Sequence, residues 1–263
     1  MVISTPKTLA LDFDGVICDG LIEYFQTAWR AYQELFDIKA ANPPAGLAER
    51  FYPLRPVIES GWEMPVLLHA LQSGYGNGDV LRNWNAIAHD LISEANLEPG
   101  QVATVVDTVR DQWIRADLDS WLAQHRFYPG IIERIKQAQQ SGVEIIIIST
   151  KEGRFIHQLL SQAELFITQA QIYGKEVGRP KYQTLQILQS KLPQPIWFIE
   201  DRIKALASVK ERKELEEIML FLADWGYNTA TDRQDALNDP RLQLLELSTF
   251  THSFPEWIPS TGI

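Results

Sequence analysis

The stretch that decides the fold is Thr8-Leu9-Ala10-Leu11-Asp12-Phe13-Asp14-Gly15-Val16, in which a short apolar run ends in two carboxylates and a glycine. In extended backbone, residues i and i+2 point to the same side, so we expect Asp12 and Asp14 to converge where the strand stops. Gly15 allows the chain to turn away sharply. Paired carboxylates suit a hard cation such as Mg²⁺, or a nucleophile beside a proton carrier. The alternative is a strand that ends in two solvated aspartates before a turn.

These residues resemble the first motif of the haloacid dehalogenase superfamily, in which hydrophobic residues precede Asp-x-Asp-Gly near the N-terminus. The resemblance implies that Asp12 takes up a phosphoryl group and that Asp14 acts as general acid and base. The dehalogenase branch lacks the second aspartate, and phosphonate-cleaving relatives commonly carry a small residue there. Asp14 therefore favours phosphoryl transfer.

A second run, Val143-Glu144-Ile145-Ile146-Ile147-Ile148, is typical of a parallel strand that is buried on both faces. It ends in the hydroxyls of Ser149 and Thr150. Ser149 resembles the second-motif residue that hydrogen-bonds a phosphate oxygen, and Thr150 takes this role if the register is shifted by one. The alternative is that one of the two hydroxyls caps the next helix.

The segment Gly178-Arg179-Pro180-Lys181, followed by leucines at helical spacing, predicts a helix with Pro180 in its first turn. A helix dipole disfavours a cation at this end, so Lys181 is better explained if an anion lies opposite it. Lys181 resembles the third-motif lysine, which neutralises the nucleophile and the incoming phosphate. Lys175 and Arg179 compete for this role, and a solvated Lys181 is the alternative.

The fourth element is Pro195-Ile196-Trp197-Phe198-Ile199-Glu200-Asp201-Arg202, a short apolar strand that ends in adjacent carboxylates. The acidic pair resembles the fourth motif, which completes the metal site, although the commoner pattern has a preceding glycine or a later aspartate. The resemblance implies one Mg²⁺ bound through Asp12, the backbone carbonyl of Asp14 and Asp201. Glu200 is then a direct or a water-mediated ligand. Ligands of open α/β sheets bind at the carboxyl ends of strands, where three of the four elements stand.

Downstream of residue 126 the chain alternates between helix and strand patterns. This alternation predicts a doubly wound parallel α/β sheet with right-handed crossovers, which also contains the first strand at 8–13. The expected core is residues 1–18 and 127–250. Its expected helices are 129–141, 153–164, 180–191 and 203–216, and its expected strands are 143–149, 166–168, 195–200, 218–223 and 242–247.

The intervening residues 19–126 carry helical periodicity and almost no strand-like alternation. The expected helices are 24–36, 56–73, 80–95 and 99–124. An all-helical insertion after the first motif resembles the cap of the helical-cap branch, and the resemblance implies a cap that closes over the site and selects small soluble phosphoesters. The tail 251–263 is aromatic and proline-rich without periodicity.

Within this insertion, Arg55, Glu59, Trp62 and Glu63 have the spacing of one helix face. An arginine on that face is a candidate for binding a substrate carboxylate or a second phosphate, and Trp62 is a weaker substrate candidate. The alternatives are a surface ion pair between Arg55 and Glu59 and a core position for Trp62. The histidines show no metal-ligand spacing.

The charge of the chain narrows the class of partner. Its 24 Lys and Arg against 34 Asp and Glu give a net charge of −10, and no Lys/Arg-rich run occurs. Nucleic acid and anionic membrane surfaces are therefore not expected partners. The same charge repels a phosphate substrate, so the site needs a metal ion and a lysine.

Cys18 is the single cysteine, which fits a reducing compartment and a small packed thiol. No secretory signal pattern is visible at the N-terminus, and no apolar stretch approaches the roughly 20 residues of a membrane span. A cytoplasmic location is expected.

The sequence thus predicts a Mg²⁺-dependent hydrolase that removes phosphate from a small soluble phosphoester through an aspartyl-phosphate. Two alternatives stay open. One is a phosphomutase or phosphotransferase of the same superfamily, and the other is a non-catalytic ligand-binding relative. The intact carboxylate pairs weigh against the second.

Overall fold

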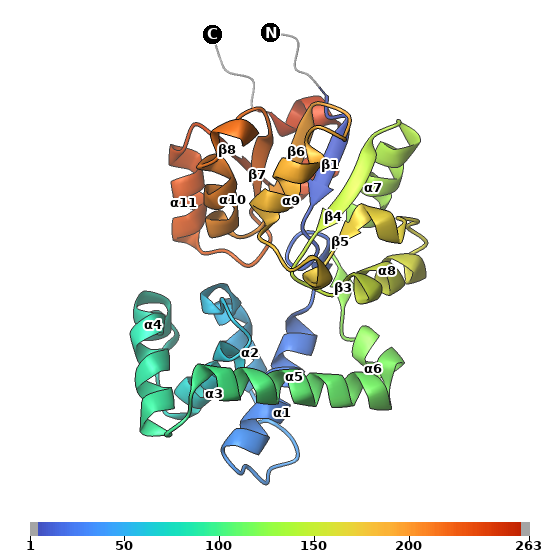
Figure 1. Cartoon of the computed structure of the whole chain (residues 1–263). Coiled ribbons are helices and arrows are strands. Elements are labelled where there is room, and N and C mark those ends of the chain that lie inside the picture. The colour runs from blue at the N-terminus through green and yellow to red at the C-terminus, as the bar shows by residue number, and fades with distance from the viewer. Residues whose placement is uncertain (1–4, 259–263) are drawn as a thin grey trace. The chain divides into compact units, whose positions relative to one another are not determined.

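The computed structural model describes residues 5–258, and the chain divides into two compact units (Figure 1). One unit contains the chain up to Asp19 and from Arg126 onward, and the other is Gly20–His125. The sequence places the corresponding boundaries at residues 18/19 and 126/127.

The first unit is built on a six-stranded parallel sheet, which confirms the predicted fold class. The strand order is β5-β4-β1-β6-β7-β8. From β1 the chain adds β4 and β5 on one side and then β6, β7 and β8 on the other, so the strand order reverses between β1 and β6. The carboxyl ends of these two strands therefore form the topological switch point, where open α/β sheets bind their ligands. The strands are β1 (Thr8–Leu11), β4 (Glu144–Ile148), β5 (Ile172–Tyr173), β6 (Ile196–Glu200), β7 (Met219–Ala223) and β8 (Leu242–Leu245).

Helices cover both faces of this sheet because successive strand residues alternate between the faces. On one face, Phe198 belongs to a core cluster with side chains of α9, α10 and α11. On the other face, the Trp197 ring lies 5.0 Å from that of Phe221 and 5.7 Å from that of Trp257. The helices of this unit are α7 (Ile131–Gln140), α8 (Gly153–Gln162), α9 (Lys181–Leu188), α10 (Ile203–Lys210), α11 (Ala230–Asn238) and α12 (Leu247–Phe250).

Short 3-10 helices complete the unit: η2 (Gln169–Gln171), η3 (Lys175–Val177), η4 (Lys213–Leu215) and η5 (Phe254–Trp257). The last of these lies in the segment that the sequence marks as a tail without periodicity. Phe254 and Trp257 are buried against the sheet, so this part of the tail belongs to the core. The rest of the predicted tail, 259–263, lies outside the described residues.

Two predicted elements of this unit need correction. The strand expected at 166–168 is wrong, because β5 lies at Ile172–Tyr173 and Phe166 is 80% exposed. The helix expected over 203–216 ends at Lys210 and is followed by η4. The structure also adds α11, which begins at a capping box between Thr229 and Asp232.

A short antiparallel ribbon forms where the chain leaves and re-enters the first unit. Its strands β2 (Cys18–Asp19) and β3 (Arg126–Phe127) pair Cys18 with Phe127 and Asp19 with Arg126. The ribbon joins the two ends of the insertion to each other, so residues far apart in the sequence share one exit point from the core.

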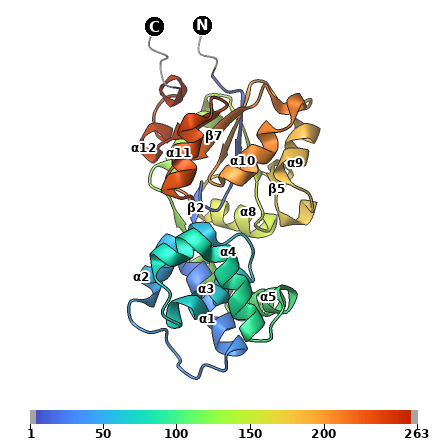
Figure 2. The same ribbon diagram turned by 90° about the vertical axis from the view of Figure 1, so that its left-hand side faces the viewer.

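All regular elements of the second unit, Gly20–His125, are helices. Helix α3 is buried along most of its length and contacts both α1 and α4 (Figure 2). The predicted helix 56–73 is wrong in its first part, because a 3-10 helix ends at Val57 and α3 begins only at Glu63. The elements are α1 (Leu21–Leu35), α2 (Leu47–Phe51), η1 (Tyr52–Val57), α3 (Glu63–Gln72), α4 (Asn77–Glu94), α5 (Pro99–Ala116) and α6 (Leu118–Leu122).

A buried carboxylate ties the helices of this unit together. Glu23 of α1 is 1% exposed and accepts hydrogen bonds from Arg110 Nε of α5, at 2.8 Å, and from Trp121 Nε1 of α6, at 3.1 Å. A charge buried this deeply is tolerated only when it is paired, as it is here.

None of the helices within residues 5–258 combines the length and the apolar character that crossing a membrane requires.

Candidate active site

Asp12 stands at the carboxyl end of the central strand. All four residues of β1 are buried between β4 and β6, and the Asp12 N–H still donates to the Ile199 carbonyl at 3.0 Å. Asp12 is only 6% exposed, and its Oδ1 accepts from the Phe13 N–H at 2.7 Å. The hydrogen bonds between the strands and this local hydrogen bond from Phe13 hold the carboxylate in place.

Glu200 and Asp201 are delivered by the neighbouring strand, β6. Glu200 is fully buried, and its Oε1 accepts from the Arg202 N–H at 3.1 Å. Asp201 is 1% exposed, and its Oδ2 accepts from the Tyr227 N–H at 2.6 Å. Because β1 and β6 are parallel neighbours, these two carboxylates reach the same point as Asp12.

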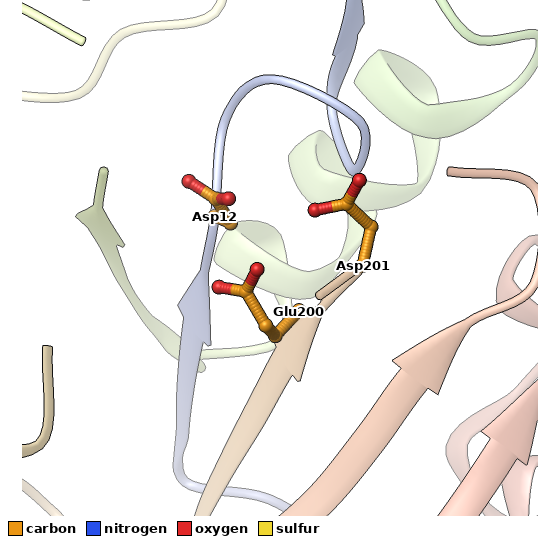
Figure 3. Close-up of side chains that lie close together, drawn as sticks. All are labelled: Asp12, Glu200 and Asp201. Atoms are coloured by element: carbon orange, nitrogen blue, oxygen red, sulfur yellow. The ribbon is translucent and has the colours of Figure 1, made fainter. Parts of the chain in front are cut away.

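The three carboxylates form one buried cluster at the switch point (Figure 3). Asp12, Glu200 and Asp201 each offer an oxygen that lies within 4.8 Å of the others. Oxygen-only sets of this kind suit hard divalent cations. The cluster is therefore a candidate metal centre.

Lys181 is the cation that faces this cluster. It is the first residue of α9, and its Nζ lies 2.7 Å from Asp12 Oδ2 and 2.5 Å from Glu200 Oε2. Pro180 is the N-cap rather than a first-turn residue, which shifts the predicted start of the helix by one. An anion does lie opposite Lys181, so the lysine is not simply solvated.

The charge of Lys181 does not offset the effect of burial and of the neighbouring carboxylate on Asp12. Burial and the nearby charge of Glu200 raise the pKa of Asp12 to about 7, even though Lys181 acts in the opposite direction. Burial likewise raises the pKa of Glu200. Burial alone would lower the pKa of Lys181, but the carboxylates of Asp12 and Glu200 raise it.

Two glycines allow the loops to approach Asp201 closely. A Cβ on Gly15 would lie 2.1 Å from Asp201 Oδ2, and a Cβ on Gly226 would lie 2.2 Å from Asp201 Cβ. Gly15 also has a φ of +87°, which other residues rarely adopt. The glycine of the first motif is thus required both by the turn and by the space beside Asp201.

The second aspartate of that motif has a different partner. The strand ends at Leu11 and the chain turns, so the alternation expected between Asp12 and Asp14 does not continue to Asp14. Its carboxylate instead accepts from Lys151 Nζ at 3.2 and 3.3 Å, and it is not part of the buried cluster found within residues 5–258. The expected convergence of the two carboxylates therefore stays a prediction.

Lys151 is the residue of this site that the sequence patterns missed. It follows the end of β4 by three residues, and β4 is the other neighbour of β1. A cation in the loop after a buried central strand is the signal that could have indicated it, but that pattern names no partner.

The two hydroxyl candidates differ in burial. Ser149 is 6% exposed, and its Oγ accepts from the Lys151 N–H at 3.3 Å, whereas Thr150 is exposed. Neither caps the next helix, because the N-cap of α8 is Glu152 and it makes no side-chain capping bond. The capping alternative is therefore wrong.

Of the three cations considered for the third motif, Lys181 is the one paired with the cluster. Arg179 Nε donates to Thr184 Oγ1 at 3.0 Å, and Lys175 is exposed in η3.

The substrate candidates of the second unit do not share a helix face. Arg55 lies in η1, whereas Trp62 and Glu63 begin α3, so the expectation of one common face is wrong. Arg55 stacks 4.2 Å from the Tyr24 ring centroid and donates to the Ile58 carbonyl at 2.9 Å. Trp62 is half-buried against the core of the unit.

Comparison of the chain with known proteins identifies its family. The model of the haloacid dehalogenase-like hydrolases matches residues 6–211. A phosphoglycolate phosphatase of Pseudomonas putida is 24% identical over 163 residues, which are 61% of this chain and 47% of that protein. The chain thus spans about half the length of the curated relative it matches.

Solved structures share the fold at lower identity. A protein of Clostridium difficile superposes with a TM-score of 0.57 at 11% identity, covering 94% of this chain and 97% of that one. A haloacid dehalogenase-family hydrolase of Deinococcus radiodurans, solved with phosphate and sodium, gives 0.50 at 17% identity and 91% coverage of both chains. With a family model that matches most of the chain and a carboxylate cluster at the switch point, this protein belongs to the haloacid dehalogenase-like hydrolases.

Proposed function

We propose that this protein is a Mg²⁺-dependent phosphatase that hydrolyses a small soluble phosphoester through an aspartyl-phosphate on Asp12. The observation that carries the proposal is the buried carboxylate cluster with Lys181 between two of its members. The phosphoglycolate phosphatase of Pseudomonas putida suggests 2-phosphoglycolate as the first substrate to test.

The donor set fits a divalent metal ion. Three buried carboxylates lie together and one ammonium group contacts two of them, and the raised pKa of Asp12 reflects burial together with the nearby charge of Glu200. A hard dication would remove this excess of negative charge. We propose Asp12 and Asp201 as its side-chain ligands and the Asp14 carbonyl as a backbone ligand.

We propose that Glu200 holds Lys181 and contacts the metal either directly or through a water molecule. One of its oxygens accepts from the Arg202 N–H, and the other lies 2.5 Å from Lys181 Nζ. When bound, Mg²⁺ would supply positive charge for the oxygens of the transferring phosphoryl group.

The proposed reaction begins at Asp12. One of its carboxylate oxygens attacks phosphorus, so that a bond from this oxygen to phosphorus forms while the ester P–O bond breaks. Asp14 gives its proton to the leaving alkoxide, which departs as an alcohol. Lys181 and the hydroxyl of Ser149 or Thr150 stabilise the charge on the phosphoryl oxygens.

Water then completes the cycle. Asp14, now ionised, takes a proton from a water molecule as that water attacks the aspartyl-phosphate, and phosphate and free Asp12 are released. Lys151 fixes the Asp14 carboxylate through contacts to both of its oxygens. The Asp14 carboxylate lies outside the buried cluster, so the side chain that would move the proton differs from the side chains that would bind the metal.

The test is a panel of phosphoesters, with 2-phosphoglycolate among them, assayed with and without Mg²⁺ for release of inorganic phosphate. We expect turnover only with the metal and a covalent adduct at Asp12 in mass spectra of rapidly quenched or beryllofluoride-trapped enzyme. Asp201→Asn should weaken Mg²⁺ binding sharply in titration calorimetry.

Three outcomes would contradict the proposal: full activity of Asp12→Asn, an adduct on another residue, or unchanged metal affinity in Asp201→Asn. Transfer of the phosphoryl group to a second alcohol without phosphate release would identify a phosphotransferase instead.

A further inference from the structure

A cavity of about 460 Å³ lies at the end of the first unit that is opposite to the carboxylate cluster. Its lining includes Lys7, which precedes β1, and Val143, which precedes β4, so it opens at the amino ends of these strands. Asp12 follows the carboxyl end of β1, roughly 13 Å away along four residues of about 3.3 Å each. The volume falls within the range of small-molecule sites.

The charge of this cavity contrasts with that of the chain. None of its lining residues is acidic, and Lys7, Arg134 and His252 are basic, whereas the whole chain carries −10. His252 lies 3.1 Å from Glu256, so its ring is engaged. Lys7 and Arg134 are therefore the cations that the cavity offers to a ligand.

Arg134 is a largely buried cation with one hydrogen-bonding group that lacks a protein partner. It is 7% exposed, and its buried Nε has no hydrogen-bond partner among residues 5–258. Its guanidinium carbon lies 4.1 Å from the Phe254 ring centroid and 5.8 Å from that of Trp257. Stacking satisfies the face of a guanidinium, but its N–H groups point outward in the plane and still require acceptors.

Leaving a buried N–H group of a cation without an acceptor is costly, and an arginine does not escape by losing its proton. An anion in the plane of the guanidinium would accept charge-assisted hydrogen bonds from two of its N–H groups at once. Lys7, which is exposed at the rim, would contact a second negative group of the same molecule.

We propose that this cavity, between α7 and η5, binds a small organic anion whose carboxylate or phosphate group is held by Arg134 and whose second charge is held by Lys7. The ligand does not reach the carboxylate cluster, so the site is separate from the proposed phosphatase chemistry and does not depend on it.

The test is titration calorimetry on the full chain after removal of metal ions, with citrate as the carboxylate probe and inorganic phosphate as the phosphate probe. Without metal, the carboxylate cluster repels both anions, which leaves the cavity as the expected site. We expect one saturable site for at least one probe, and the preferred probe identifies which group Arg134 binds.

The variants separate the cavity from other sites. Arg134→Lys keeps the charge but loses the planar pair of N–H donors. Because one charge-assisted hydrogen bond corresponds to about ten-fold in affinity or more, this variant should bind the probe at least that much more weakly. Lys7→Gln should weaken binding several-fold. The matched control is Lys136→Gln, on the same helix but outside the cavity lining, which should bind like the wild type.

Absence of saturable binding to either probe would overturn the inference. So would equal affinity in Lys7→Gln, an exposed position whose replacement leaves the core intact even if Arg134→Lys fails to fold. Binding that is lost in Lys181→Met but kept in Lys7→Gln would assign the anion to the carboxylate cluster and would also contradict the proposed site.

Discussion

Lys151 contacts both oxygens of the Asp14 carboxylate, at 3.2 and 3.3 Å, and the two side chains are only 10% and 15% exposed. An ion pair that is largely shielded from water is stronger than one at the surface and holds its partners in one geometry. A proton carrier must be fixed within hydrogen-bonding reach of the atom it serves. We therefore regard Lys151 as the residue that positions Asp14.

Replacing Lys151 by methionine should lower kcat about ten- to hundred-fold and leave the affinity for Mg²⁺ unchanged, because the loss concerns the orientation of Asp14 and not the metal ligands. Lys151→Arg should restore part of the rate. The measurement is steady-state kinetics at saturating metal, with a thermal melt of each variant. In an Asp14→Asn background, Lys151→Met should have little further effect on kcat, and a full additive loss would contradict the positioning role.

Asp14→Asn should reduce turnover by about 10²–10⁴-fold, the usual loss for a positioned acid and base. Metal binding should be largely retained, because the Asp14 carboxylate lies outside the buried cluster found in the described chain. Titration calorimetry with Mg²⁺ and single-turnover kinetics measure the two effects separately. Asp37→Asn, at an exposed ion pair, is the matched control. A parallel loss of metal affinity and activity in Asp14→Asn would show that the carboxylate belongs to the metal site.

The residues of the site differ in how far a local sequence pattern predicts their positions. Asp12, Glu200 and Asp201 each end a buried strand, and this local pattern places them at one edge of a parallel sheet. Lys181 is predictable because a cation at a helix start needs an anion opposite. The pairing of Lys151 with Asp14 joins residues 137 positions apart, and no local pattern names such a partner.

At the scale of elements, the turn after β1 sets the position of the cluster. It reverses at Gly15, whose φ is +87°, and passes so close to Asp201 that a Cβ would lie 2.1 Å from Oδ2. The same loop carries the hydrogen bond from the Gly15 N–H to the Cys18 carbonyl at 2.8 Å. The turn, the acidic loop after β6 and the ribbon β2–β3 are therefore constrained together.

Gly15→Ala should displace Asp201 and strain the turn, so we expect a loss of stability of about 1–3 kcal/mol and a marked loss of Mg²⁺ affinity. Gly100→Ala is the control, since this glycine lies in α5 with open space around it, and the change should be neutral or stabilising by about 0.5 kcal/mol. Chemical denaturation and metal titration give both quantities. Gly15→Ala with wild-type metal affinity would show that the close approach to Asp201 is dispensable.

The elements that the sequence predicts best are those with an unbroken apolar run or a clear helical period. The strands β4, β6 and β7 are buried and the helix α8 is amphipathic, and their predicted bounds agree within two residues. In contrast, β5 and the ribbon strands have two residues each, which is too short for any period to show. Helix α11 buries only Ala236, so its pattern carries almost no amphipathic signal.

At the scale of the whole molecule, a chain of net charge −10 concentrates three buried carboxylates at one point. Without metal, burial and the charge of Glu200 raise the pKa of Asp12 from 3.8 to about 7. An acid whose pKa is raised in the folded state stabilises that state fully only below its unfolded pKa. This contribution is lost as the pH rises from about 4 through 7, because the folded protein must then bury a charge that the unfolded chain exposes.

A metal ion that binds the ionised cluster should reverse this trend. We expect the increase in Tm on adding Mg²⁺ to be small at pH 5.5 and larger at pH 8, because binding at low pH must first displace the proton from Asp12. At a concentration one hundred times Kd the metal should add about 2.7 kcal/mol to the free energy of unfolding. Thermal melts at both pH values, with and without Mg²⁺, measure the difference. Asp201→Asn should abolish it, whereas Asp37→Asn should not. An equal increase in Tm at both pH values would mean that the stabilising metal binds away from Asp12.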